Sequence, residues 1–278
     1  MKPNKPLDAL FDGLACSIID GRVWLDGSAP VAQMATAPLR GLSGWLVLER
    51  FPEVAADCFK PGQDGNQPPA YVFQLQSDVR DRLAGFDFRC VTWDRDRKLA
   101  DAFCAVWGGA GGHPFGQGDV RVKAVEVVRR RDGVLRTLRP EPVVTRCLLG
   151  LVTPVLLKDG GRGWFGPGTL TLPRLVAAAT RRLNALSAVY GNGVRIDERE
   201  SVVEAADVTV ARAELQWRSP ERKSSVQGGA VIKLSGVTGY FCLESVPLAL
   251  AELLAAATLF HVGKHACEGC GRLKVREE

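Results

Sequence analysis

A short segment near the carboxyl terminus holds the greatest concentration of chemically versatile side chains in this chain. It reads FHVGKHACEGCGRLKV over residues 260–275 and contains two histidines, two cysteines and three glycines beside basic residues. Imidazoles and thiols bind transition metals, whereas glycines and cations suit a phosphate chain. The segment therefore has three interpretations: a metal site, an ordinary helix end and a phosphate-binding loop.

The metal interpretation uses His261, His265, Cys267 and Cys270, which are spaced as H-x3-H-x-C-x2-C. Four such ligands could hold zinc in tetrahedral geometry, in a zinc-stabilised protein unconnected with nucleic acid. Structural zinc sites usually join two separated ligand pairs, so one compact cluster is less typical. We therefore predict no metal and no other cofactor.

In the second interpretation the segment simply ends a helix, with buried cysteines, surface histidines and glycines that serve the turns. In the third, Gly269 and Gly271 let the backbone approach a phosphate, and Lys264 and Arg272 supply positive charge. Spacing alone favours the ordinary helix end.

The elements that must position this segment follow from hydrophobic periodicity. In the first half we expect strands and helices in the order strand, helix, strand, strand, helix, strand, over residues 15–25, 39–48, 70–75, 86–93, 94–111 and 119–131. The second half repeats that order over residues 146–157, 172–191, 207–217, 230–244, 245–264 and 272–275. Each βαββαβ unit is typical of a ferredoxin-like domain. The sequence thus predicts an α+β protein with two tandem ferredoxin-like (RRM-like) domains, residues 1–140 and residues 145–278, the second carrying the glycine-rich loop.

The composition is compatible with nucleic-acid binding but does not establish it. The 278 residues are 46% hydrophobic and 24% charged, with a net charge of +5, which is too small a bias to indicate nucleic-acid binding by itself. No apolar run reaches the length needed to cross a bilayer, and the amino terminus lacks the hydrophobic region of a signal peptide. We expect a cytoplasmic protein with no membrane partner.

Five stretches in register resemble one known family. HVGK followed by G-x-G-R in the carboxyl-terminal segment is similar to the final signature of the CRISPR-associated repeat-RNA processing endoribonucleases, which belong to the superfamily of repeat-associated mysterious proteins. The other four are PLRGLSGWL (38–46), PPAYVFQL (68–75), HPFGQGDVRVKAVEVV (113–128) and WRSPERKSSVQGG (217–229). Two ferredoxin-like domains are the fold that this resemblance implies, in agreement with the order of elements.

The resemblance implies metal-independent cleavage of CRISPR repeat RNA into mature crRNA. The 2′-hydroxyl would attack the adjacent phosphorus to give a cyclic phosphate, and the enzyme would stay on its product. The implied partners are the CRISPR repeat RNA or crRNA hairpin and other subunits of an effector complex. An alternative is a catalytically inactive subunit that only binds crRNA.

The catalytic residues depart from the family pattern, in which a catalytic histidine generally lies in the first domain. All three histidines of this chain lie at or after His113. Arg22 and Arg40 stand in that neighbourhood instead, which resembles the branch of the family found in type IV CRISPR systems. Arginine keeps its proton, so it would stabilise the phosphorane rather than act as a base. The alternative catalysts are His261 and His265, which share one helix face if the helix extends that far.

Further basic residues could contact the RNA backbone, although runs of charge are often only solvated surfaces. An A-form hairpin is recognised mainly by shape and backbone contacts, so we expect steep salt dependence. The complete set of predicted RNA-binding residues is Arg129, Arg130, Arg131, Arg181, Arg182, Arg222, Lys223, Ser224, Lys264, Gly269, Gly271 and Arg272.

Overall fold

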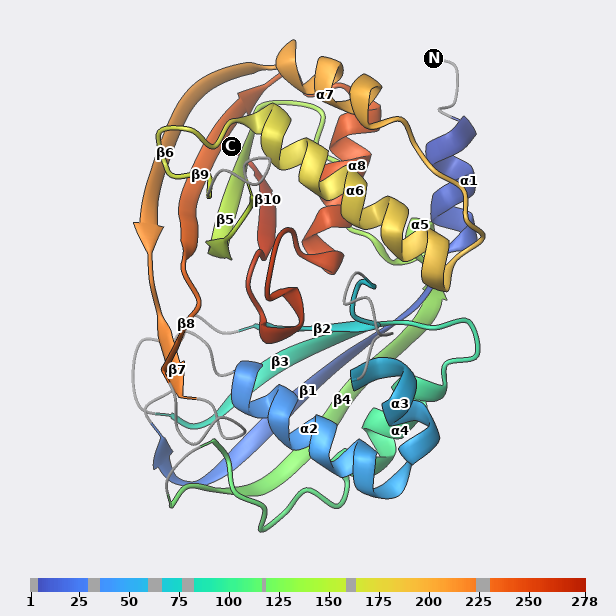
Figure 1. The fold of residues 1–278 in the computed structure, drawn as a ribbon, viewed down its shortest axis with the longest axis vertical. Coiled ribbons are helices and arrows are strands. Elements are labelled where there is room, and N and C mark those ends of the chain that lie inside the picture. Colours follow the sequence, from blue (N-terminus) through green and yellow to red (C-terminus); the bar gives the residue numbers. More distant parts are fainter. Residues whose placement is uncertain are drawn as a thin grey trace.

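A computed structural model describes residues 5–29, 36–59, 67–76, 83–116, 119–158, 164–223 and 231–278 (Figure 1). Its first half contains β1 (Ala15–Ala29), α2 (Thr36–Arg50), β2 (Tyr71–Leu75), β3 (Leu83–Trp93), α4 (Lys98–Trp107) and β4 (Arg121–Val134). These strands form an antiparallel sheet in the order β2-β3-β1-β4. That order is the one a βαββαβ ferredoxin-like unit produces.

The second half repeats the arrangement. It contains β5 (Cys147–Val155), α6 (Leu172–Tyr190), β6 (Thr209–Arg218), β9 (Gly236–Glu244), α8 (Leu248–Phe260) and β10 (Leu273–Glu277). The sheet order β10-β5-β9-β6 is equivalent to that of the first half. The predicted α+β class with two tandem ferredoxin-like units is therefore confirmed.

Several shorter elements complete the chain. They are α1 (Lys5–Gly13), α3 (Pro52–Phe59), α5 (Leu135–Leu138), α7 (Glu198–Ala206), the 3-10 turn η1 (Ala266–Glu268) and the hairpin of β7 (Glu221–Lys223) with β8 (Val231–Lys233). Periodicity had suggested one strand over residues 230–244, but β8 and β9 are separate strands in different sheets.

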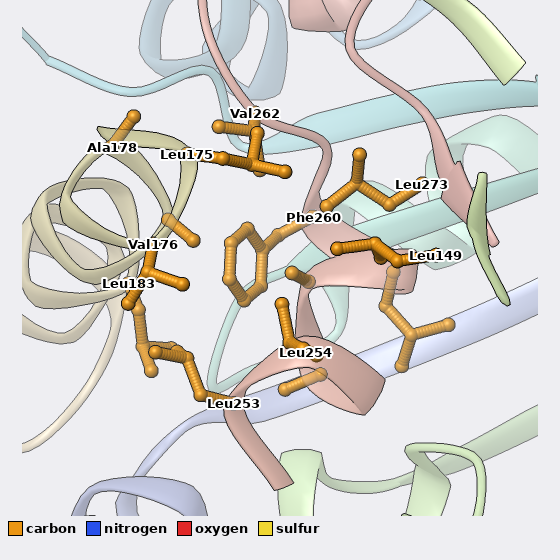
Figure 2. Packing of buried hydrophobic residues seen from close by; sticks show 14 of the residues in the cluster. Leu149, Leu175, Val176, Ala178, Leu183, Leu253, Leu254, Phe260, Val262 and Leu273 are labelled. Atoms are coloured by element: carbon orange, nitrogen blue, oxygen red, sulfur yellow. The ribbon is translucent and has the colours of Figure 1, made fainter. Parts of the chain in front are cut away.

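Each sheet has a core on its helical side. In the first half, α2 and α4 cover the sheet with buried residues such as Leu46 and Phe103, which pack against Phe88. In the second half, Phe260 at the end of α8 lies between residues of α6 and the sheet, and Figure 2 shows Leu149 and Leu175 around it.

The second core also extends across the chain's midpoint. Leu10 and Phe11 of α1 belong to it, as do Ile18 and Val91 from the far face of the first sheet. Strands of the first sheet end at Val134 and those of the second begin at Cys147, so the division between residues 140 and 145 stays a prediction. Within the described ranges, no helix combines the length and apolar character that a membrane span requires.

Candidate functional site

The carboxyl-terminal segment forms a tightly bonded loop between α8 and β10. The amide of Val262 donates to the carbonyl of Gly271 over 2.8 Å, which closes the loop on itself. The amides of Lys264 and Gly271 donate to the carbonyls of Leu156 and Pro154, over 3.1 and 2.9 Å, at and just beyond the end of β5. The loop is therefore fixed by backbone bonds to the second sheet.

The glycines of this loop serve packing rather than ligand binding. Gly269 has φ 91°, and a Cβ there would lie 2.3 Å from the hydroxyl of Thr36. Gly271 has φ 72°, and a Cβ there would lie 1.8 Å from the carbonyl oxygen of Val262. The Gly269 amide already donates to Ala266 over 3.1 Å, and that of Gly271 is used as described above. These two amides are not available to a phosphate, which corrects the expectation from sequence.

The loop joins the two halves of the molecule. The Thr36 hydroxyl, at the start of α2, donates to the carbonyl of Glu268 over 2.7 Å. Arg272 donates through Nη1 to the carbonyl of Leu75 at the end of β2. In Figure 1 the dark red loop accordingly descends from α8 to meet β2. Arg272, predicted to bind RNA, thus has a structural bond across the two halves.

His261 is a structural histidine. Its side chain is fully buried, and Nδ1 lies 2.9 Å from the carbonyl oxygen of Cys270. Burial, with the nearby charges of Arg272 and Arg182, lowers the pKa of His261 to about 3. Helix α8 ends at Phe260, so the predicted helix face shared with His265 does not exist. The buried imidazole is not placed to contact RNA, so this geometry does not favour His261 as a catalyst.

His265 lies at the rim of the loop. Its side chain is 33% exposed, and Nδ1 is 3.6 Å from a carboxylate oxygen of Glu268, whose side chain is only 11% exposed. A carboxylate at Nδ1 orients an imidazole and leaves Nε2 for chemistry. Glu268 was missed in the sequence, although its i, i+3 spacing from His265 is visible there.

Arg40 reaches the same loop from the opposite half of the chain. It lies on α2, is partly exposed, and donates through Nε to the Tyr71 hydroxyl over 3.0 Å. Burial opposes its charge, but Tyr71, Cys267 and Glu268 outweigh burial and raise the pKa of Arg40. The structure therefore places Arg40 on the helix that contacts the loop carrying His265 and Glu268.

Arg22 lies elsewhere. It forms a two-pronged ion pair with Asp87 on β3, at 2.5 and 3.0 Å. Its neighbour Val23 belongs to the core under α2, so Arg22 projects from the other face of the sheet. Arg22 and Arg40 occupy opposite faces of the first sheet, and the structure does not assemble them into one site.

The two arginines of α6 differ. Arg181 is exposed and pairs with Glu198 over 2.6 Å. Arg182 donates through Nε to the carbonyl of Phe260 over 2.7 Å, and its Nη2 is buried. Burial lowers the pKa of Arg182 to about 10. Arg182 supports the end of α8 from within, so its predicted RNA contact is not supported by this geometry.

The remaining predicted contacts lie on β4 and on the hairpin of β7 and β8. On β4, Arg129 is exposed, whereas Arg130 pairs with Asp101 over 2.5 Å and Arg131 lies 3.8 Å from Asp20. All three lie within β4, in agreement with the strand expected over residues 119–131. Arg222 and Lys223 belong to β7, and Ser224 lies outside the described residues.

The zinc interpretation finds no support in this arrangement. The two histidines face different partners, namely the Cys270 carbonyl and the Glu268 carboxylate. In the part of the chain that is described, no group of three or more histidine, cysteine, aspartate or glutamate side chains is placed to hold a metal ion. The arrangement instead offers an arginine and a carboxylate-oriented histidine, which suit phosphoryl chemistry.

Comparisons with known proteins found one matching family model and several similar solved structures. The family model described as CRISPR-associated endoribonuclease Cas6 matches residues 149–273. A solved Cas6 product complex is 18% identical, with a TM-score of 0.63 over 95% of this chain and 100% of that one. Cas6 from Thermus thermophilus is 16% identical, with a TM-score of 0.55 over 94% and 99%. A chain of a Cas6-RT-Cas1–Cas2 complex is 10% identical, with a TM-score of 0.63 over 96% of this chain and 29% of that one. A search of curated proteins found no match.

Proposed function

We propose that the chain is an endoribonuclease of the Cas6 family that cuts CRISPR repeat RNA at Arg40, His265 and Glu268, since the Cas6 family model matches residues 149–273 and solved Cas6 structures share the fold. The observation that carries this proposal is the position of Glu268. Its carboxylate lies 3.6 Å from His265 and acts electrostatically on Arg40, which comes from the other half of the molecule. An RNA strand lying across the edge where α2 meets the loop would contact both Arg40 and His265.

The reaction requires three events at one phosphate. Neutral His265 accepts the proton of the 2′-hydroxyl, whose oxygen then forms a bond to phosphorus. Arg40 stabilises the negative charge that gathers on the phosphorane oxygens. The bond from phosphorus to the 5′ oxygen breaks, and that oxygen takes a proton from solvent. The products are a 2′,3′-cyclic phosphate and a free 5′-hydroxyl. A site without a dedicated acid should turn over slowly.

Slow turnover suits a protein that retains its product. Solved Cas6 structures include product complexes and a substrate-mimic complex, and one relative is a chain of a larger Cas6-RT-Cas1–Cas2 assembly. We infer that this chain likewise holds its crRNA and joins other CRISPR subunits. Assignment to a type IV system rests on Arg22 and Arg40 standing in the neighbourhood where the family generally has a catalytic histidine. The cytoplasmic location likewise stays a prediction.

The test is cleavage of RNA carrying the repeat of the host's CRISPR array, in EDTA. We expect a cyclic-phosphate product from the wild type and a rate more than tenfold lower in Arg40→Ala, with RNA affinity largely kept. Arg40→Lys should recover part of the rate because it restores the charge. Arg121, an exposed arginine that donates to the Gly112 carbonyl over 2.8 Å, provides a matched control as Arg121→Ala. Bound but uncut RNA would instead favour the inactive crRNA-binding subunit.

A further inference from the structure

An exposed tryptophan lies beside the loop and is absent from the site described so far. Trp164 is 43% exposed, which is unusual for the largest apolar side chain. The ammonium groups of two lysines lie over its ring, Lys264 at 4.9 Å and Lys158 at 5.9 Å from the centroid. Both lysines are themselves exposed. A cation–π contact stabilises one such pair, but two like charges gathered at one ring repel each other.

The cluster is held in place by its surroundings. Lys158 and Trp164 form an isolated antiparallel bridge just beyond β5. The amide of Lys264 donates to Leu156 over 3.1 Å. The guanidinium of Arg174, on α6, lies 4.3 Å from the ring centroid of Phe165. Backbone hydrogen bonding thus fixes the positions of Trp164 and Lys264. Lys264 directly precedes His265 in the sequence, so the cluster lies next to the proposed site.

An exposed ring flanked by cations matches one ligand chemistry well. Unpaired RNA presents flat bases that stack on aromatic rings, and each base lies between phosphates that attract lysine. A base inside an A-form helix has both faces occupied by its neighbours and cannot stack on a protein side chain. We propose that Trp164 stacks one unpaired base of the RNA beside the cleavage site, while Lys158 and Lys264 contact the flanking phosphates. This inference rests on the proposed function, because it places the base next to His265.

The experiment distinguishes the contribution of the base to RNA affinity from that of the phosphates. Binding is measured for a ten-nucleotide oligouridylate and for an oligomer of the same length and charge that has abasic sites. Stacking of a base contributes about fivefold or more in affinity, so wild type should prefer the uridylate by at least that ratio. Trp164→Ala should bring the ratio close to one, and Trp164→Phe should retain most of it. Lys158→Gln and Lys264→Gln should each lower the slope of log affinity against log salt by about 0.7 while leaving the ratio intact.

A matched control is available in Trp45, which is 50% exposed and contacts the ring of His113 rather than a lysine. Trp45→Ala should leave the ratio unchanged. An unchanged ratio in Trp164→Ala would overturn the proposal, as would an equal loss of affinity for both oligomers accompanied by a lower melting temperature. Failure of the wild type to cut repeat RNA would refute the proposed function instead, whatever the ratio.

Discussion

The buried imidazole of His261 should make the stability of the fold depend on pH in a way that a single substitution removes. Its pKa falls from 6.5 to about 3 on folding, chiefly because burial disfavours the charged form. In the unfolded chain the imidazole takes up a proton as the pH drops below 6.5, whereas in the folded chain it stays neutral. The unfolded state therefore binds more protons, and stability must fall as the pH is lowered.

The size of the effect follows from the two pKa values. At pH 7.5 both states are almost fully neutral, and the contribution is close to zero. At pH 5 the unfolded imidazole is nearly all protonated, whereas the folded one is not. This pH lies about 1.5 units below the unfolded pKa of 6.5. At 1.36 kcal/mol per unit this removes about 2 kcal/mol of unfolding free energy. Above pH 6.5 the imidazole costs no stability, and the loss grows as the pH falls from 6.5 to about 3.

The substitution that isolates this effect is His261→Asn. Asparagine, like histidine, carries a Cβ at this backbone conformation and keeps a polar side chain toward the Cys270 carbonyl, but it does not titrate. Urea unfolding of both proteins at pH 7.5 and pH 5 gives four free energies. Wild type should lose about 2 kcal/mol more than the variant between the two pH values, since all other titrating groups are common to both. An equal loss of unfolding free energy in the two proteins would refute the argument that His261 is buried and neutral. His261 would then again be a candidate catalytic base.

Two further substitutions test the loop itself. Glu268→Gln should slow repeat cleavage several-fold while RNA affinity changes little, because the Glu268 carboxylate lies 3.6 Å from Nδ1 of His265 and helps to position the imidazole; an unchanged cleavage rate would contradict that role. Gly271→Ala should lower the unfolding free energy by more than about 1 kcal/mol, since its Cβ would meet the Val262 carbonyl at a positive φ. Gly41→Ala, at a helical position with open space around the new Cβ, should be neutral or mildly stabilising in the same denaturation assay, and similar losses in both variants would refute the packing argument.

Hydrophobic periodicity predicted the main strands and helices because each is long enough for its period to be recognised in the local sequence. β4 alternates over many residues, and α6 presents a clear apolar face. The order of these elements was then sufficient to predict both sheet topologies. Smaller elements escaped: α5 has only four residues, and α7 has a weak apolar pattern with a single buried side chain, Ala205.

The candidate site was predicted less well because its roles depend on partners far away in sequence. Arg22 is neutralised by Asp87, which lies 65 residues further along the chain. Arg182 supports the end of α8 through the Phe260 carbonyl, 78 residues away. No spacing rule shows such pairs, so a basic residue looks equally available to RNA whether it is free or engaged. Resemblance located the loop, but only packing distinguishes His265 at its rim from His261 beneath it.

The loop's internal bonding explains how one segment can be both a structural connector and part of a reactive site. The amides of Gly269 and Gly271 and the imidazole of His261 are bonded within the fold, and the hydrogen bond from Thr36 to Glu268 joins residues 232 positions apart. A connector that strong fixes Glu268 relative to α2, and therefore fixes the approach of Arg40 to His265. RNA then contacts side chains that are already positioned, so little conformational entropy is lost from the protein on binding. The same rigidity leaves the loop few backbone donors for phosphate, so charge at the rim, above all from Arg40 and Lys264, must supply the attraction.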